Sequence, residues 1–106
     1  MIVHPLWAFP MTTAEQTKQI LTNSMSEFSD NPPILNLEVI DYEDTHGEPA
    51  LWVTVIIPEE ADVDKWQGRD ISRMKFLMRE KLRNEGIDLF PYISIAKPSD
   101  LEDDSE

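Results

Sequence analysis

The sequence predicts an α+β domain of order αββαβ, a two-layer sandwich with two helices packed on one face of a three-stranded sheet. Residues 34–42 alternate between two faces with the period of a half-buried strand. Residues 50–58 form a mostly apolar strand segment, with Leu51, Val53, Val55 and Ile57 on one face and Trp52, Thr54 and Ile56 on the other. Residues 12–28 and 70–85 repeat apolar side chains at the spacing of an amphipathic helix. A third strand is expected over 89–97, and helices that cover one sheet face give the simplest such fold.

The first helix is expected to begin at Thr12 or Thr13. Each of these residues precedes a Glu or Gln by three positions, which is the pattern of a capping box. Apolar residues then recur at helical spacing as far as Phe28. The helix must end before Pro32 and Pro33, because proline cannot continue it.

The two alternating segments are expected to pair as a hairpin through the connection EDTHGEP. Gly47 can supply the positive φ that such a connection needs. Four acids surround His46 in this region, but the spacing from Asp41 puts Trp52 where a calcium loop needs its glutamate. We therefore interpret the stretch as a charged turn and expect no metal site.

The second helix is expected from Asp70 to Glu85, with Gly86 at its C-terminal end. The segment 69–83 contains six of the nine basic residues of the chain. Lys75, Arg79 and Arg83 form a row at spacing i, i+4, i+8. This basic ridge is either a nucleic-acid contact or a solvated helix face with local ion pairs, and the second interpretation is favoured.

One domain is expected over residues 12–97, preceded by an apolar lead-in over 1–11 and followed by an acidic tail over 98–106 that should be disordered. The lead-in lacks the features of a signal peptide, and no stretch is long enough to span a bilayer. The chain has no cysteine, which suits a reducing compartment. We expect a soluble cytoplasmic protein.

The net charge of −12 disfavours broad binding to phosphate backbones or anionic membranes. No common catalytic or nucleotide-binding motif occurs, and the three glycines are too far apart to cradle a phosphate. We therefore expect no enzymatic activity, no catalytic residues and no cofactor.

Large apolar side chains are expected on the sheet face that points away from the helices. Tyrosine and tryptophan are the residue types that anchor protein interfaces. A face of this kind needs a cover, which is either the lead-in, a second copy of the protein or another partner. The expected partner-binding residues are Ile40, Tyr42, Trp52, Ile56 and Tyr92, with Ile34 on the same face.

The element order resembles the KH-like and ferredoxin-like groups and the cytoplasmic domains of cation efflux transporters. The G-x-x-G clamp of KH modules is missing, since WQGRD has one glycine. The last strand, PYISIAK, has no histidine to serve as a metal ligand. The resemblance therefore implies a fold and no activity.

These observations favour a small acidic interaction protein, of adaptor, antitoxin or immunity type, or a homodimer that acts through the apolar sheet face. The alternative is a nucleic-acid-binding module that uses Lys75, Arg79 and Arg83. A protein partner or self-association is expected, and binding to a membrane is not.

Overall fold

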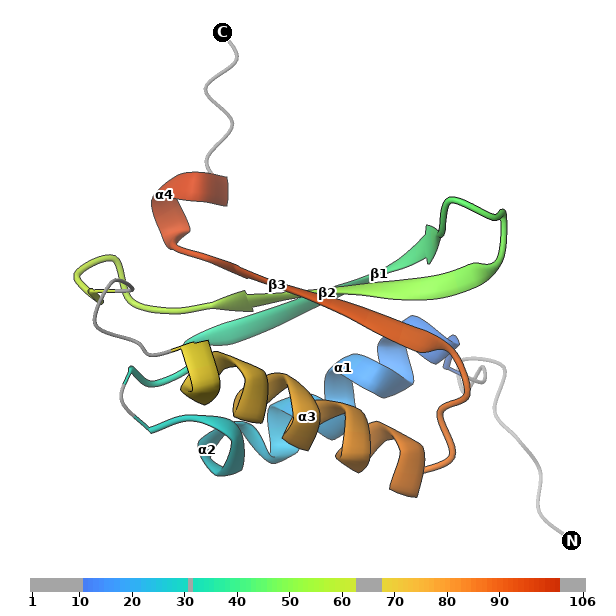
Figure 1. Ribbon diagram of the computed structural model, residues 1–106, viewed down its shortest axis with the longest axis horizontal. Coiled ribbons are helices and arrows are strands. Elements are labelled where there is room, and N and C mark those ends of the chain that lie inside the picture. Colours follow the sequence, from blue (N-terminus) through green and yellow to red (C-terminus); the bar gives the residue numbers. More distant parts are fainter. Residues whose placement is uncertain (1–10, 31, 63–67, 102–106) are drawn as a thin grey trace, which may run out of the picture.

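The computed structural model describes residues 11–30, 32–62 and 68–101, and within them it has the predicted α+β architecture. Three helices, α1 (Thr13–Asn23), α2 (Met25–Phe28) and α3 (Gly68–Asn84), lie on one side of a three-stranded sheet (Figure 1). A short helix, α4 (Pro98–Leu101), stands on the opposite side of the sheet.

The sheet is mixed, with β2 (Pro49–Ile56) at its centre. Strand β2 pairs antiparallel with β1 (Asn36–Glu43) and parallel with β3 (Phe90–Ala96). Both β1 and β3 are edge strands. The parallel pairing requires a long crossover between β2 and β3, and α3 provides it on the helix side.

The core lies between the sheet and the helices. The strands contribute every second residue to it, and α3 contributes residues four apart, because these are the periods at which side chains return to one face. Core side chains from these elements include Leu21, Leu37, Val53, Val55, Met74, Met78, Leu82 and Ile93.

The first helical segment begins as predicted. Thr12 is its N-cap, and Thr12 and Glu15 exchange side chain to backbone hydrogen bonds in a capping box. The segment is broken at Ser24, where the backbone (φ −124°, ψ 20°) leaves the helical region. The single helix expected as far as Phe28 is therefore two, and Phe28 enters the core from α2.

Helix α3 starts two residues before its predicted start and ends near its predicted end. Gly86 adopts the left-handed conformation (φ 86°), and the N–H of Ile87 donates to the carbonyl of Leu82, as in a Schellman end. The buried stripe consists of Met74, Met78 and Leu82, while Ile71 is half-buried.

The alternation predicted for residues 34–42 fails at its start. Ile34 was expected on the open face but lies buried in the core. Leu35, which the same alternation places on the helix side, is exposed. Strand β1 begins at Asn36, so the strand alternation does not extend to these residues. The chain that arrives from α2 instead places Ile34 under the helices.

The expectation of disorder from residue 98 is wrong for Pro98–Leu101, which form α4. Residues 102–106 and most of the lead-in, residues 1–10, lie outside the described part of the chain. Whether the lead-in covers the open sheet face therefore stays a prediction.

Candidate functional site: an aromatic face of the sheet

The sheet face opposite α1, α2 and α3 is built from rows of side chains that the strand register fixes. One row contains Tyr42, Ala50 and Phe90, and the next contains Ile40, Trp52 and Tyr92. The following rows are Glu38, Thr54 and Ser94, and then Asn36, Ile56 and Ala96. Large apolar groups are therefore concentrated at one end of the face, next to the hairpin.

Four aromatic rings at this end contact one another. The ring of Tyr42 lies 5.0 Å from Trp52 and 5.5 Å from Tyr92, measured between centroids. Trp52 stacks on Tyr92 at 6.4 Å, and Tyr92 meets Phe90 edge to face at 4.8 Å. Such separations are typical of favourable aromatic pairs, so the rings hold one another in place across all three strands.

We call Ile40, Tyr42, Trp52, Phe90 and Tyr92 the aromatic face. Its members remain in contact with solvent: Ile40 is 59% exposed, Phe90 50% and Tyr42 37%, while Trp52 and Tyr92 are half-buried. The guanidinium of Arg79 lies over the Phe90 ring, and a large part of the remaining area of these side chains faces solvent, which makes the aromatic face an apolar surface of the kind that marks interaction sites.

The partner-binding residues expected from the sequence differ from the aromatic face at two positions. Ile56 is on the open side but lies two rows away from the rings and is 7% exposed, so it does not belong to the aromatic face. Phe90 does belong to it and was missed. The strand periodicity in the sequence could have identified it, because Phe90 precedes Tyr92 by two residues in the same strand and must share its face.

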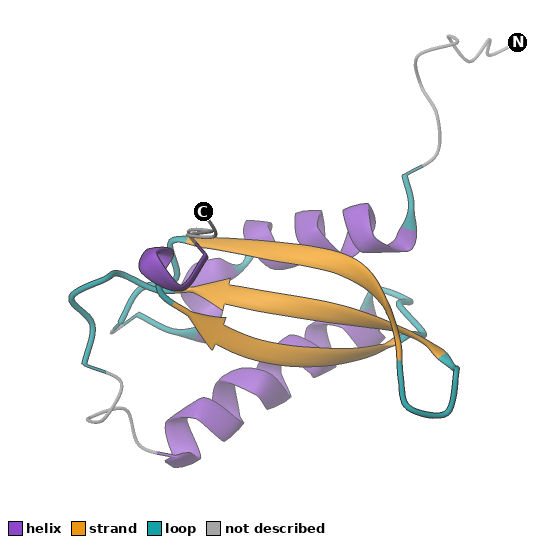
Figure 2. Cartoon of the chain, turned by 90° about the horizontal axis from the view of Figure 1, so that it is seen from above, coloured by secondary structure: helices purple, strands orange, loops and turns teal. Residues whose placement is uncertain are grey.

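The end of the sheet away from the rings carries α4 (Figure 2). The carboxylate of Glu59, which follows β2, accepts hydrogen bonds from the hydroxyl of Ser99 (2.7 Å) and from its backbone N–H (2.9 Å). These two bonds hold the pKa of Glu59 below its ordinary value of 4.5. They join α4 to the segment that leaves the central strand.

The acidic hairpin connection is a turn, as predicted. One carboxylate oxygen of Asp44 accepts the N–H groups of His46 (2.8 Å) and Glu48 (2.9 Å), and Gly47 has a φ of 79°. The side chain of Asp44 thus stabilises the turn by accepting hydrogen bonds from its backbone. Among the described residues, no cluster of three or more His, Cys, Asp or Glu side chains could hold a metal ion.

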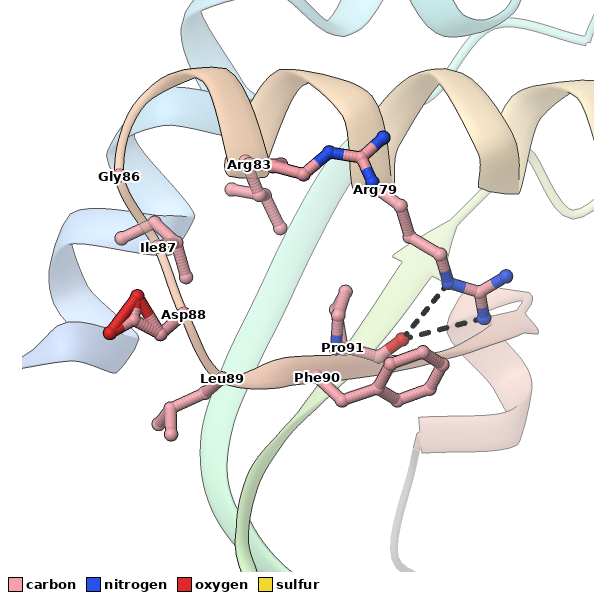
Figure 3. A pocket seen from close by; sticks show the side chains of 9 residues that line it. Arg79, Arg83, Gly86, Ile87, Asp88, Leu89, Phe90 and Pro91 are labelled. Carbon is pink, nitrogen blue, oxygen red and sulfur yellow. Dashed lines mark hydrogen bonds between the residues drawn. The ribbon is translucent and has the colours of Figure 1, made fainter.

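The expected basic ridge is not a uniform row. Arg79 donates from Nε and Nη2 to the carbonyl of Pro91, both at 3.4 Å, and its guanidinium lies 4.9 Å from the centroid of the Phe90 ring (Figure 3). Arg83 forms an ion pair with Glu80. Two of the three cations therefore already have partners within the domain.

Arg79 closes part of the open edge of β3. Pro91 has no N–H to offer to another strand, and Arg79 occupies its carbonyl. A shallow pocket of about 370 Å³ adjoins this contact. Its walls are Arg79, Leu82, Arg83, Gly86, Ile87, Asp88, Leu89, Phe90 and Pro91 (Figure 3). Phe90 belongs to both the pocket and the aromatic face, so the two surfaces are continuous.

Comparisons with known proteins leave the site to be interpreted from its own geometry. No family model and no curated protein sequence matches the chain. Among solved structures, the organic hydroperoxide resistance protein OhrB of Bacillus subtilis is similar, with a TM-score of 0.33 and 16% sequence identity. The match covers 79% of this chain and 63% of the OhrB chain.

The described residues contain no helix that is both long enough and apolar enough to cross a bilayer.

Proposed function

We propose that the protein is a non-enzymatic interaction module that binds another protein chain through the aromatic face, and that it acts in the cytoplasm. An adaptor, an antitoxin or an immunity protein would work in this way. The observation that supports the proposal is the contiguous, solvent-facing cluster of Tyr42, Trp52, Phe90 and Tyr92 with Ile40 beside it.

The composition of the cluster suits protein recognition. Tyrosine and tryptophan bring large apolar area with few rotatable bonds, and they dominate the energetics of many interfaces. The rings are already packed on one another, so binding would order few additional side chains. A surface that is arranged in advance in this way loses little entropy when a partner covers it.

Nucleic acid is a weaker candidate for the ligand. Aromatic rings can stack on bases, but such surfaces are usually set in a positive field. Here the chain carries a net charge of −12, and Arg79 and Arg83 already have partners. The proposal therefore rests on protein recognition, and nucleic acid remains one outcome of the test.

The test is affinity capture of the tagged protein from its native host, with and without nuclease, followed by mass spectrometry. Ile40→Asp and Trp52→Asp place a charge in the aromatic face. Phe76→Asp is the matched control, because Phe76 is also an exposed apolar residue (58%) but lies on α3. We expect the two sheet variants to lose a stoichiometric protein partner and the control to keep it.

Capture that is equal in all three variants would refute the aromatic face as the binding surface. A partner that disappears after nuclease treatment would instead favour nucleic acid. In that case Lys75→Glu combined with Arg83→Glu should abolish binding at low salt, where phosphate contacts are strongest.

A further inference from the structure

We propose that the outer edge of β3 is a second binding site, and that it accepts an extended segment of another protein in which acidic and apolar residues alternate. The segment would pair with β3 as a fourth strand of the sheet. This inference goes beyond the proposed function, because it concerns the edge of the sheet and different atoms from the aromatic face. It follows from the backbone groups that β3 leaves open and from the charges beside them.

The strand register shows which backbone groups of β3 point away from the sheet. The N–H of Ile57 donates to the carbonyl of Ala96, so Ala96 directs its backbone groups toward β2. In a parallel pair every second residue does so, and the residues between them point outward. The outward positions are therefore Pro91, Ile93, Ile95 and, just past the strand, Lys97.

The two ends of this edge are closed. At one end Pro91 has no N–H, and its carbonyl accepts hydrogen bonds from Arg79. At the other end Asp100 in α4 binds both backbone groups of Lys97. The carboxylate of Asp100 accepts the N–H of Lys97, and the N–H of Asp100 donates to the carbonyl of Lys97, both at 2.9 Å. Pairing with another chain is therefore limited to the residues between these ends.

The stretch between the closed ends is open. The N–H and C=O groups of Ile93 and Ile95 have no hydrogen-bond partner among the described residues, and these are the groups that an added strand needs. Strand β3 also has no charged residue from Phe90 to Ala96. The other edge strand, β1, is instead protected against pairing by three acidic side chains, those of Glu38, Asp41 and Glu43.

Helix α3 places positive charge beside the open groups. Arg79 contacts Phe90 and Pro91 at the edge, and Lys75 lies one turn away on the same flank of the helix. Because α3 and β3 run in opposite directions (Figure 1), Lys75 is displaced from Arg79 toward the end of β3. The displacement is about 6 Å, close to the rise of two strand residues, which brings Lys75 level with Ile93.

The helix also provides a floor for a fourth strand. Seen from above (Figure 2), α3 runs along the β3 side of the sheet, and its first half lies outside the edge of β3. A strand that is added to β3 would therefore lie over the helix flank that carries Lys75 and Arg79. Within the described part of the chain, neither cation forms an ion pair, so both charges can bind a carboxylate.

The alternation in the partner segment follows from this geometry. Residues directly opposite Ile93 and Ile95 share their side of the sheet, which is the helix side, so they meet Lys75 and Arg79. Acidic side chains are favoured at these positions. The residues between them point to the open side, next to Tyr92 of the aromatic face, where apolar side chains are favoured.

Charge and space disfavour a second copy of the chain at this edge. Antiparallel pairing of β3 with β3 of another copy would bring the two α3 helices side by side, with their basic flanks facing each other. Like charges across an interface oppose binding. Strand β1 of another copy is acidic, but α1 packs beneath it in the space that α3 fills beside β3. The acidic segment therefore belongs to a different protein.

The test uses a synthetic peptide of alternating valine and glutamate, about nine residues long and blocked at both ends, added to isotope-labelled protein. The buffer contains about 0.15 M NaCl, which screens charges more than about 8 Å away, so the nearby cations decide binding rather than the net charge of −12. We expect an NMR titration to give a Kd below about 1 mM. A peptide of alternating valine and lysine should not bind.

Hydrogen exchange identifies the paired backbone groups. The amides of Ile93 and Ile95 are open in the free protein and should become protected when the peptide binds. Those of Tyr92 and Ser94 point toward β2 and should exchange slowly with and without the peptide. This alternation is the signature of a strand added at the edge, and binding elsewhere on the protein would not produce it.

Two variants alter the site by different means, and circular dichroism verifies that each is folded. Lys75→Glu should raise Kd about three- to tenfold, because an attraction becomes a repulsion. Lys81→Glu is the matched control, since Lys81 lies on the other flank of α3 with Phe28, and it should change Kd by less than about twofold. Ile95→Pro removes an outward N–H, as Pro91 already does, and should abolish binding.

Several results would overturn the inference. These are a glutamate peptide that does not bind at about 1 mM, equal Kd values in Lys75→Glu and Lys81→Glu, or no protection of Ile93 and Ile95. Ile40→Asp separates this site from the proposed function, because Ile40 is on the opposite edge strand. That variant should keep peptide binding while it loses the partner captured by the aromatic face, so each proposal can fail without the other.

Discussion

Thr17 offers an unusual route to a more stable protein. Its side chain is fully buried where α1 packs on the sheet, and its hydroxyl oxygen has no hydrogen-bond partner in the described part of the chain. A buried hydroxyl without a partner has lost its hydrogen bonds to water and has not replaced them, which destabilises the folded state. Thr17→Val replaces this hydroxyl with a methyl group of almost the same volume, so the core should accept it without repacking.

The expected gain can be estimated from two contributions. Removing an unsatisfied buried hydroxyl is worth about 1–3 kcal/mol. A buried methyl group adds up to about 0.8 kcal/mol, and the helix propensities of threonine and valine are similar. Allowing for partial relaxation of the site, we expect the free energy of unfolding to rise by about 1–2 kcal/mol.

Thermal and urea unfolding, followed by circular dichroism, measure this change. The melting temperature should rise by about 4–9 °C, given the unfolding entropy of a chain of this size. Thr22→Val is the matched control, since Thr22 is on the same helix but exposed, and it should change stability by less than about 0.5 kcal/mol. A loss of stability in Thr17→Val would refute the reasoning, because it would mean that the hydroxyl has a partner in the folded protein.

Three further predictions concern the core, the α4 contact and the hairpin. Leu82→Ala should lower the free energy of unfolding by about 2–5 kcal/mol in urea titrations, because Leu82 is 1% exposed among core side chains; a loss below about 1 kcal/mol would contradict this. Ser99→Ala should raise the pKa of Glu59 toward 4.5 in an NMR titration. Because the folded-state pKa is lowered, the stabilisation by Glu59 is present above pH 4.5 and is lost as the pH falls through the lower value. An unchanged pKa would show that the Ser99 hydroxyl is not its cause, since alanine keeps the backbone N–H that also donates to Glu59. Gly47→Ala should cost about 1 kcal/mol, because alanine is strained at φ 79°, and a neutral result would exclude that backbone conformation.

Features encoded by neighbouring residues could be predicted from the sequence. The capping box of Thr12 and Glu15, the turn around Gly47 and the end of α3 at Gly86 each depend on residues a few positions apart. The alternation within each strand likewise identified most side chains of the open face. Where the alternation was extended beyond the strand, to Ile34 and Leu35, it gave the wrong face.

The sequence by itself determined the three strands, the helices α1 and α3, the fold class and the side of the sheet on which Ile40, Tyr42, Trp52 and Tyr92 lie. The tertiary structure alone decided the parallel pairing of β3 with β2, which brings Tyr92 beside Trp52. It also decided that the guanidinium of Arg79 lies over the ring of Phe90. It likewise decided that the carboxylate of Glu59 accepts a hydrogen bond from Ser99, 40 residues away along the chain. These contacts join residues that are distant along the chain, and local periodicity carries no information about which elements become neighbours in space.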